Sequence, residues 1–81
     1  MTLLYFAWVR QKIGKGEERM AVPVSDVAGL IAHLKNLGPS YADVFADLSR
    51  IRVAVNQHHA GLDAKIGPND EVAFFPPVTG G

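Results

Sequence analysis

The residues best suited to chemistry stand at the end of the sequence, which closes with Pro76-Pro77-Val78-Thr79-Gly80-Gly81. The two prolines end strand pairing and stiffen the segment. The two glycines have no side chains, so the backbone can enter a narrow channel and come close to a reactive group. At ~3.3–3.6 Å per residue, the segment from Pro76 reaches roughly 20 Å. We therefore predict a flexible tail over residues 76–81 that presents its carboxylate, with an inert frayed terminus as the alternative.

Cysteine chemistry is excluded, because the chain contains no cysteine. This rules out disulfides, thiolate metal sites, a cysteine nucleophile and a persulfide on a side chain. Histidine offers little for a metal. His58 and His59 are adjacent, so in a strand their side chains point to opposite faces, and only His33 remains to assist. We expect no metal site.

The composition is typical of one small globular domain. Of the 81 residues, 48% are hydrophobic and 20% are charged. Eight basic and eight acidic side chains give no net charge, which argues against binding to nucleic acid or to a membrane surface. Arg10, Arg50 and Arg52 form at most a modest basic patch. No apolar run approaches the ~20 residues of a spanning helix and no basic leader opens the sequence, so we expect a cytoplasmic protein.

The first elements that must position the tail are two predicted strands. Thr2 to Arg10 is rich in aromatic and aliphatic residues on both alternating faces, which indicates a strand inside a sheet. A polar turn over Gly14 to Glu18 leads to a second strand, Arg19 to Pro23, in which Met20 and Val22 alternate with smaller or polar residues. This pattern predicts a β-hairpin.

The main helix is predicted to begin at Ser25 as its N-cap, with Asp26 facing the positive end of the helix dipole. Gly38 at the C′ position and Pro39 after it should end the helix. Gly29 costs about 1 kcal/mol relative to alanine, and close packing on the sheet is the expected reason for it. The apolar residues recur at helical spacing and form one stripe: Val27, Leu30, Ile31, Leu34 and Leu37.

The second half of the sequence adds a short helix and further strands. Ser40 to Asp43 has the shape of a capping box, and apolar spacing extends the short helix to Leu48. Beyond it we predict a strand over Ile51 to Val55, a short strand and turn over His58 to Ala64, a turn over Gly67 to Asp70 and a last strand over Glu71 to Phe75.

This order of elements predicts an α+β fold, a β-grasp (ubiquitin-like) roll over residues 1–75. It would have a mixed sheet of four or five strands, one main helix and one short helix. One helix covers only one side of such a sheet, yet Leu4, Phe6 and Trp8 have no obvious internal cover, and Phe75 alternates away from Phe74. An exposed apolar surface of this kind indicates a protein–protein interface. The alternative is that the short helix or the strand ends cover it.

Three blocks of the sequence carry a resemblance to a known family: Tyr5-Phe6-Ala7 with Val9-Arg10, then Val53-Ala54-Val55-Asn56-Gln57, then Asn69-Asp70-Glu71-Val72-Ala73-Phe74-Phe75-Pro76-Pro77-Val78-Thr79-Gly80-Gly81. The chain resembles the small subunit of molybdopterin synthase, the ubiquitin-like sulfur carrier of molybdenum-cofactor synthesis. The last block is very specific. The resemblance covers the whole chain, although Glu17 to Arg50 matches in pattern only.

The resemblance implies that this chain is the sulfur-donating subunit of a sulfurtransferase. An E1-like adenylyltransferase would use ATP to convert the Gly81 carboxylate into an acyl-adenylate, and a sulfur donor protein would convert that into a thiocarboxylate. The sulfur would pass to cyclic pyranopterin monophosphate on the large subunit of a heterotetramer and form the molybdopterin dithiolene. The chain itself would bind no cofactor. Because it has no cysteine, its terminus, Gly80-Gly81, is the only place where it could carry sulfur covalently.

The resemblance also implies which residues contact the large subunit. Phe6 and Phe75 match positions that pack on it, in agreement with the uncovered face argued above. The tail residues Pro76, Pro77, Val78 and Thr79 would continue this interface. His59 falls in the partner-facing region, but it and His58 stand where the family has apolar or small residues, and Trp8 is larger than expected. The contact at His59 is therefore left open.

Three other functions fit the same tail. A ubiquitin-type modifier would end in an isopeptide bond to lysines of other proteins. A sulfur carrier of the thiamin pathway shares the fold and the diglycine, but is generally shorter and lacks the Phe74-Phe75-Pro76-Pro77 block. A plain interaction module would have an inert tail.

Overall fold

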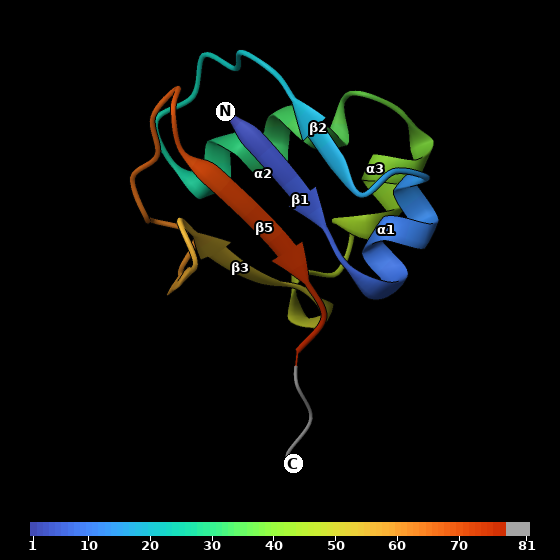
Figure 1. Cartoon of the computed structure of the whole chain (residues 1–81). Coiled ribbons are helices and arrows are strands. Elements are labelled where there is room, and N and C mark those ends of the chain that lie inside the picture. The colour runs from blue at the N-terminus through green and yellow to red at the C-terminus, as the bar shows by residue number, and fades with distance from the viewer. Residues whose placement is uncertain (78–81) are drawn as a thin grey trace.

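A mixed five-stranded sheet forms the centre of the fold (Figure 1), and its strands lie in the order β2-β1-β5-β3-β4. The computed structural model describes residues 1–77 of the chain. The strands are β1 (Thr2–Tyr5), β2 (Glu17–Arg19), β3 (Arg52–Val55), β4 (His58–Ala60) and β5 (Glu71–Phe75). The helices are α1 (Ala7–Ile13), α2 (Val27–Lys35), α3 (Pro39–Val44) and the 3-10 helix η1 (Leu48–Arg50). The predicted α+β fold is confirmed, with more helices than the two expected.

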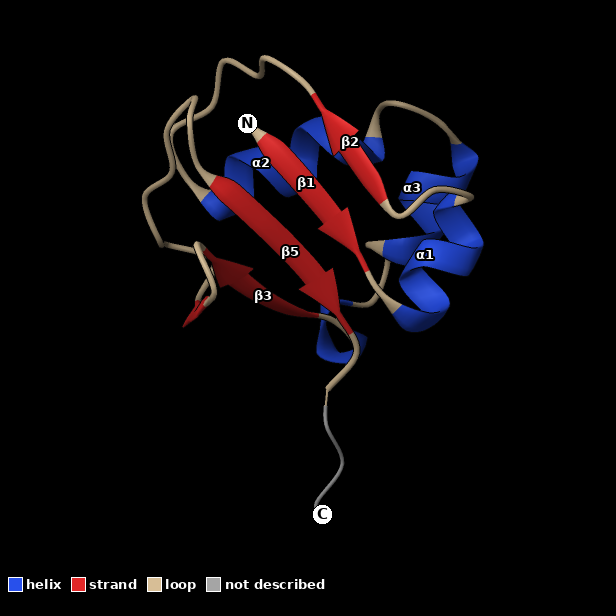
Figure 2. Ribbon diagram, in the orientation of Figure 1, coloured by secondary structure: helices blue, strands red, loops and turns tan. Residues whose placement is uncertain are grey.

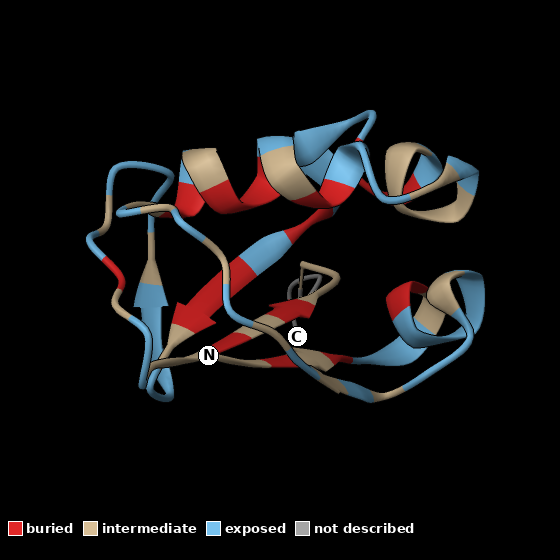
Figure 3. Ribbon diagram, turned by 90° about the horizontal axis from the view of Figure 1, so that it is seen from above, coloured by how far each residue is buried: buried red, intermediate tan, exposed pale blue. Residues whose placement is uncertain are grey.

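The buried face of the sheet is built from residues that alternate along its central strands. β1 pairs in parallel with β5, and β3 pairs with β5 in antiparallel orientation, so that Tyr5, Val53 and Phe74 lie side by side. Leu3 and Val72 form the next such pair. All five side chains are buried. Helix α2 crosses behind this face in Figure 2 and lies along it in Figure 3, so the core is enclosed between α2 and the sheet.

The predicted strand over Thr2 to Arg10 is wrong beyond Tyr5, because the chain turns into α1 at Ala7. Val9 is buried on this helix. Gly14 ends the helix in the left-handed conformation, with a φ of 93°, and its N–H donates to the Arg10 carbonyl at 2.8 Å. A sequence that is apolar at successive positions, as in Thr2 to Arg10, is compatible with a short packed helix as well as with a buried strand. Gly14 was the residue in the sequence that indicated a helix end.

Two expectations change with this helix. The second strand is Glu17–Arg19, not Arg19 to Pro23, and although it pairs with β1 in antiparallel orientation, α1 rather than a tight turn connects the two. The antiparallel pairing of the predicted hairpin is therefore confirmed, whereas its tight turn and the bounds of its second strand are wrong. Trp8 does not share a sheet face with Leu4, because it belongs to α1, where it is half-buried against the core.

The N-cap of α2 is Asp26 and not Ser25. Its Oδ1 accepts a hydrogen bond from the Gly29 N–H at 2.8 Å, which satisfies one of the free donors of the first turn. The glycine fits this cap. A Cβ at position 29 would lie 3.0 Å from Asp26 Oδ1 and 3.4 Å from Val24 Cβ, so the crowding comes from the cap and the preceding loop rather than from the sheet.

The predicted apolar stripe of α2 is buried, except at its end. Four members are buried: Val27, Leu30, Ile31 and Leu34. The helix ends at Lys35 with Asn36 as its C-cap, so Gly38 is not the C′ residue. Leu37 lies beyond the last turn and is 45% exposed. The buried stripe is therefore one residue shorter than the periodicity suggested.

The connection from α2 to the sheet starts with α3. Gly38 is the N-cap and Pro39 occupies the first turn, where proline needs no hydrogen-bond donor. No side chain caps this helix, so the predicted capping box at Ser40 is wrong. Leu48, expected to close the short helix, belongs to η1 and is exposed.

The C-terminal strands follow the prediction closely. β3 and β4 pair through a two-residue turn at Asn56 and Gln57, both with positive φ, as right-handed strand twist requires. The turn before the last strand is closed by the Asp70 N–H, which donates to the Gly67 carbonyl at 3.2 Å. The last strand has the predicted bounds.

Candidate functional site

The chain leaves the sheet at the end of its central strand, β5, drawn in red in Figure 1. We term Phe75, Pro76 and Pro77 the tail root; all three are half-buried. The remaining residues predicted for the site, Val78, Thr79, Gly80 and Gly81, lie outside the described residues and stay predictions.

The tail root is anchored by the residue before it. Phe74 is fully buried, with its ring stacked on Tyr5 at 6.1 Å and edge-on to Phe45 at 4.9 Å between ring centroids. Its carbonyl accepts a hydrogen bond from the Phe6 N–H at 3.1 Å. Because β5 is also paired on both sides, the core fixes the point at which the tail departs.

The side chains that alternate with the core residues form what we term the open face of the sheet. Phe75 lies on it, directly across from Arg52 of β3. His59 of β4 is exposed, and its ring meets that of Phe75 edge-on, with centroids 5.6 Å apart. Phe6 follows β1 at the same end of the sheet and is 48% exposed. In Figure 3, α2 lies on the other side of the sheet, and no described helix lies over the open face.

The structure thus brings three of the predicted contact residues, Phe6, Phe75 and His59, to the end of the sheet from which the tail leaves. Alternation along the predicted first strand placed Trp8 with Phe6, but Trp8 lies on α1 beneath the guanidinium of Arg50, which stands 4.5 Å from its ring centroid. This cation–π contact joins η1 to α1.

Arg52 is a surface residue that the sequence analysis did not connect with the tail. It is exposed, and its Nη1 donates to the Ile51 carbonyl at 3.1 Å. Its alternation with buried Val53 was the available signal for the open face, but only the register of β3 against β5 shows that it stands opposite Phe75.

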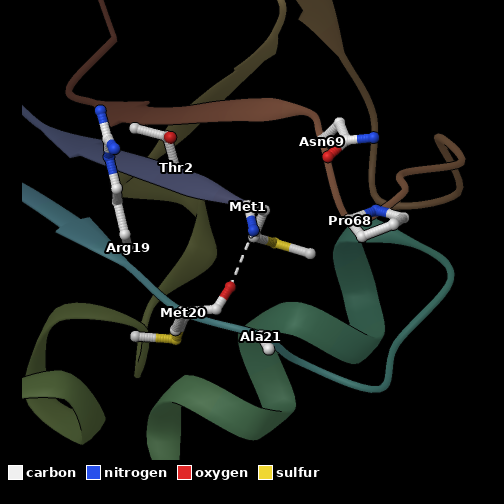
Figure 4. Close-up of a pocket in the computed structure, with 7 residues that line it drawn as sticks. All are labelled: Met1, Thr2, Arg19, Met20, Ala21, Pro68 and Asn69. Atoms are coloured by element: carbon white, nitrogen blue, oxygen red, sulfur yellow. Dashed lines mark hydrogen bonds between the residues drawn. The ribbon is translucent and has the colours of Figure 1, made fainter.

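A surface hollow of about 580 Å³ lies at the other end of the sheet (Figure 4). It is bordered by the start of β1, the end of β2 and the turn at Pro68 and Asn69. The amino group of Met1 donates to the Met20 carbonyl across it at 2.8 Å, and Arg19 stands at its rim. None of the predicted site residues within residues 1–77 lines this hollow.

Metal ligands do not gather in residues 1–77: no group of three or more His, Asp or Glu side chains there could hold an ion. His58 and His59 pair with Val55 and Ala54, which point to opposite faces of β3. Within the same described range, no helix is long and apolar enough to cross a membrane.

The ThiS family matches residues 3–81 of this chain. The molybdopterin synthase sulfur carrier subunit of Escherichia coli strain K12 is 37% identical over 79 residues, which cover 98% of this chain and 96% of that protein. Among solved structures, the putative molybdopterin converting factor subunit 1 from Pyrococcus furiosus has a TM-score of 0.76 at 29% identity and covers 95% of each chain. The Haloferax volcanii small archaeal modifier protein 1 has a TM-score of 0.79 at 26% identity, over 96% of this chain and 97% of that one.

These matches extend over nearly the whole chain, and the solved structures share its fold. The chain therefore belongs to the ThiS family of ubiquitin-like proteins. Its curated full-length relatives are sulfur carrier subunits of molybdopterin synthase. The resemblance to the molybdopterin synthase small subunit and the β-grasp fold are both confirmed.

Proposed function

We propose that this chain is the sulfur carrier subunit of a molybdopterin synthase and that the carboxylate of Gly81 carries the sulfur. The observation that supports this most directly is the tail root. Phe74 is locked in the core, Phe75 lies on the open face, and a short proline-led segment with a diglycine end follows. A rigid body that holds a thin, reactive end at a fixed point suits delivery into the active site of another protein.

The first chemical step is activation, because a carboxylate is a poor electrophile. A Gly81 carboxylate oxygen attacks the α-phosphorus of ATP on an E1-like adenylyltransferase, and pyrophosphate leaves. A hydrosulfide equivalent supplied by a sulfur donor protein then attacks the acyl carbon, and AMP leaves. The product is a thiocarboxylate at Gly81. This chain contributes bare backbone, so the acids and bases of both reactions belong to the partners.

The second step is transfer. The thiocarboxylate sulfur attacks a side-chain carbon of cyclic pyranopterin monophosphate in the active site of the large subunit, and the oxygen substituent on that carbon leaves. Water then cleaves the bond between the acyl carbon and the sulfur, which restores the Gly81 carboxylate and leaves the sulfur on the precursor as a thiolate. The dithiolene needs two sulfurs, so two transfers complete the product, in a heterotetramer of two small and two large subunits. In this scheme the chain acts as the donating half of a cytoplasmic sulfurtransferase and binds no cofactor itself.

A second candidate function is that of a protein modifier. The likeness to the Haloferax volcanii small archaeal modifier protein 1 favours it. The same acyl-adenylate would then be attacked by a lysine amine, and an isopeptide bond would form. Mass spectrometry of the protein from its own host separates the two functions. One terminal oxygen replaced by sulfur supports the carrier, whereas a family of lysine adducts supports the modifier.

Removal of Gly81 tests the carrier function. The folded body ends at the tail root, so the deletion should change the free energy of unfolding by less than ~0.5 kcal/mol. It should abolish precursor conversion with the large subunit, because the reacting atom moves by roughly 3.5 Å. A ~1 Å misplacement can cost on the order of a hundredfold in rate. Addition of one residue, Gly80→Val and Gly81→Val should act likewise. Normal precursor conversion by the deletion variant would show that sulfur is not carried on this terminus. If the chain were instead a thiamin-pathway carrier, the full-length chain itself would fail to convert this precursor.

A further inference from the structure

The length of the tail restricts where a partner can stand. Four residues follow Pro77, and fully extended they span about 13–14 Å at ~3.3–3.6 Å each. If the proposed function holds, the reaction centre that takes sulfur from Gly81 lies inside another protein. The surface of that protein must then lie against the tail root and against whatever side chains stand beside Phe75.

Arg52 is the charged residue beside Phe75. The two residues are direct partners in the antiparallel pairing of β3 with β5, so both side chains lie on the open face. The hydrogen bond from Arg52 Nη1 to the Ile51 carbonyl keeps the side chain next to the strand. A partner that reaches Phe75 therefore also covers Arg52.

No acidic side chain stands in the same row of the open face. Glu71 is paired with Thr2 at the other end of β5. Glu17, opposite Leu4 on the edge strand, has its own cation in Arg19 at 3.9 Å. Over residues 1–77, Arg52 takes part in none of the ion pairs, which join Lys12 to Asp43, Lys15 to Glu18 and Arg19 to Glu17. Its neighbour on the open face, His59, adds no negative charge.

A guanidinium covered by a partner loses its water and is strongly destabilised unless it gains an anionic acceptor. Its planar fork of donors fits a carboxylate with two parallel hydrogen bonds. We infer that the sulfur-accepting partner presents a carboxylate to Arg52, so that the docking surface consists of an apolar centre at Phe75 and an ion pair beside it. This inference rests on the proposed function.

The test measures binding of the purified large subunit of the same synthase to the full-length chain at low and high salt. Arg52→Gln should weaken binding roughly ten- to a hundredfold at low salt, as expected for loss of a charge-assisted hydrogen bond. It should also reduce the salt dependence of the association rate. Arg52→Lys keeps the positive charge but loses the planar pair of donors, so its affinity for the large subunit should lie between that of the unchanged chain and that of Arg52→Gln. Arg19→Gln removes the same charge from the open face at its far edge and should stay within twofold of the unchanged chain.

The outcomes separate this inference from the function on which it rests. Equal affinity of Arg52→Gln and Arg19→Gln, while the unchanged chain binds and transfers sulfur, overturns the carboxylate contact and leaves the carrier function intact. An unchanged chain that neither binds the large subunit nor acquires sulfur at Gly81 overturns both. Circular dichroism and urea unfolding of each variant show whether it is folded. If Arg52→Gln unfolds, Arg52→Lys is measured in its place. An affinity of Arg52→Lys equal to that of the unchanged chain would then overturn the contact of two parallel hydrogen bonds between Arg52 and a carboxylate.

Discussion

The hydroxyl of Tyr41 donates to both carboxylate oxygens of Glu18, at 2.9 Å each. Tyr5 donates to the same carboxylate at 2.7 Å, and Lys15 forms an ion pair with it at 3.1 Å. Glu18 lies on the short edge strand β2, Tyr5 on β1 and Tyr41 on α3. Only three residues of β2 pair with β1. The Glu18 carboxylate therefore adds a side-chain link from this edge strand to β1 and to α3.

Replacement of this carboxylate should be costly. Glu18→Gln removes the charge that three donors share, and we expect the free energy of unfolding to fall by roughly 1–3 kcal/mol. Glu17→Gln on the same strand is the matched control. Its side chain is exposed and reaches Arg19 only at 3.9 Å, so its effect should stay within ~0.5 kcal/mol. Urea unfolding at pH 7 measures both. Equal stability of the two variants would show that the network contributes nothing.

The same network predicts a dependence on pH. Burial alone would raise the pKa of Glu18, but the hydrogen bonds from Tyr5, Lys15 and Tyr41 outweigh it and hold the pKa below the ordinary value of 4.5. A depressed pKa gives stability that is present above the unfolded pKa and is lost as the pH falls through the folded pKa. The difference in unfolding free energy between the unchanged chain and Glu18→Gln should therefore shrink as the pH falls below 4.5. A difference that stays constant down to the acid transition would contradict the assignment.

The strands of the C-terminal half could be predicted from the sequence, because their alternation is clear and turn residues bound them on both sides. Glu71–Phe75 is the best example. The N-terminal half could not, because local pattern does not distinguish a buried strand from a short packed helix in a run such as Phe6 to Arg10. There the tertiary structure decides: β2 pairs with the short strand that remains, and Val9 fills the core from a helix.

The N-cap of α2 gives a direct test of a corrected residue. Asp26→Ala removes the side-chain acceptor of the Gly29 N–H, so stability should fall by about 1 kcal/mol. Ser25→Ala, one residue earlier and exposed, should change stability by less than ~0.5 kcal/mol. Thermal and urea unfolding of both variants measure the difference. A larger loss for Ser25→Ala would restore the cap first expected from the sequence.

Two leucines of the predicted apolar stripe should behave oppositely. Leu34 is fully buried, so Leu34→Ala leaves a cavity between α2 and the sheet and should cost ~2–5 kcal/mol. Leu37 is 45% exposed after the helix, and Leu37→Ala should cost less than ~1 kcal/mol. The urea midpoints of the two variants, compared with that of the unchanged chain, measure both losses of stability. A Leu34→Ala protein as stable as its parent would place this side of α2 in solvent.

The open face gives a prediction for binding. Phe75→Arg should abolish stable association with the large subunit and leave the fold intact, because an interface aromatic anchor is worth about 2 kcal/mol or more, and a new charge beside Arg52 adds repulsion. Phe6→Asp should act similarly. Leu37→Arg, at an exposed apolar residue that follows α2 on the other side of the sheet, is the control. Titration calorimetry measures affinity. Unchanged affinity with an unchanged circular dichroism spectrum would remove the open face from the interface.

The contact residues of the candidate site were partly accessible from the sequence. Phe6 and Phe75 stand out because they are aromatic side chains with no apparent cover. Arg52 and His59 do not, because their relation to Phe75 follows from strand register: Arg52 is opposite Phe75 on β3, and His59 reaches it from β4. A pattern within one strand shows which face a residue occupies, but not which residue of another strand lies beside it.

The central position of β5 has a consequence for synthesis of the protein. β1 and β3 do not pair with each other; each pairs with β5, which is the last of these strands to leave the ribosome. The parallel pairing of β1 with β5 joins opposite ends of the domain, and such non-local contacts form late and slowly. The nascent chain therefore has neither a closed core nor an open face until Phe75 has been made. A chain interrupted before β5 lacks the surface formed by Phe75 and Arg52, and we expect it not to bind a partner that recognises this surface.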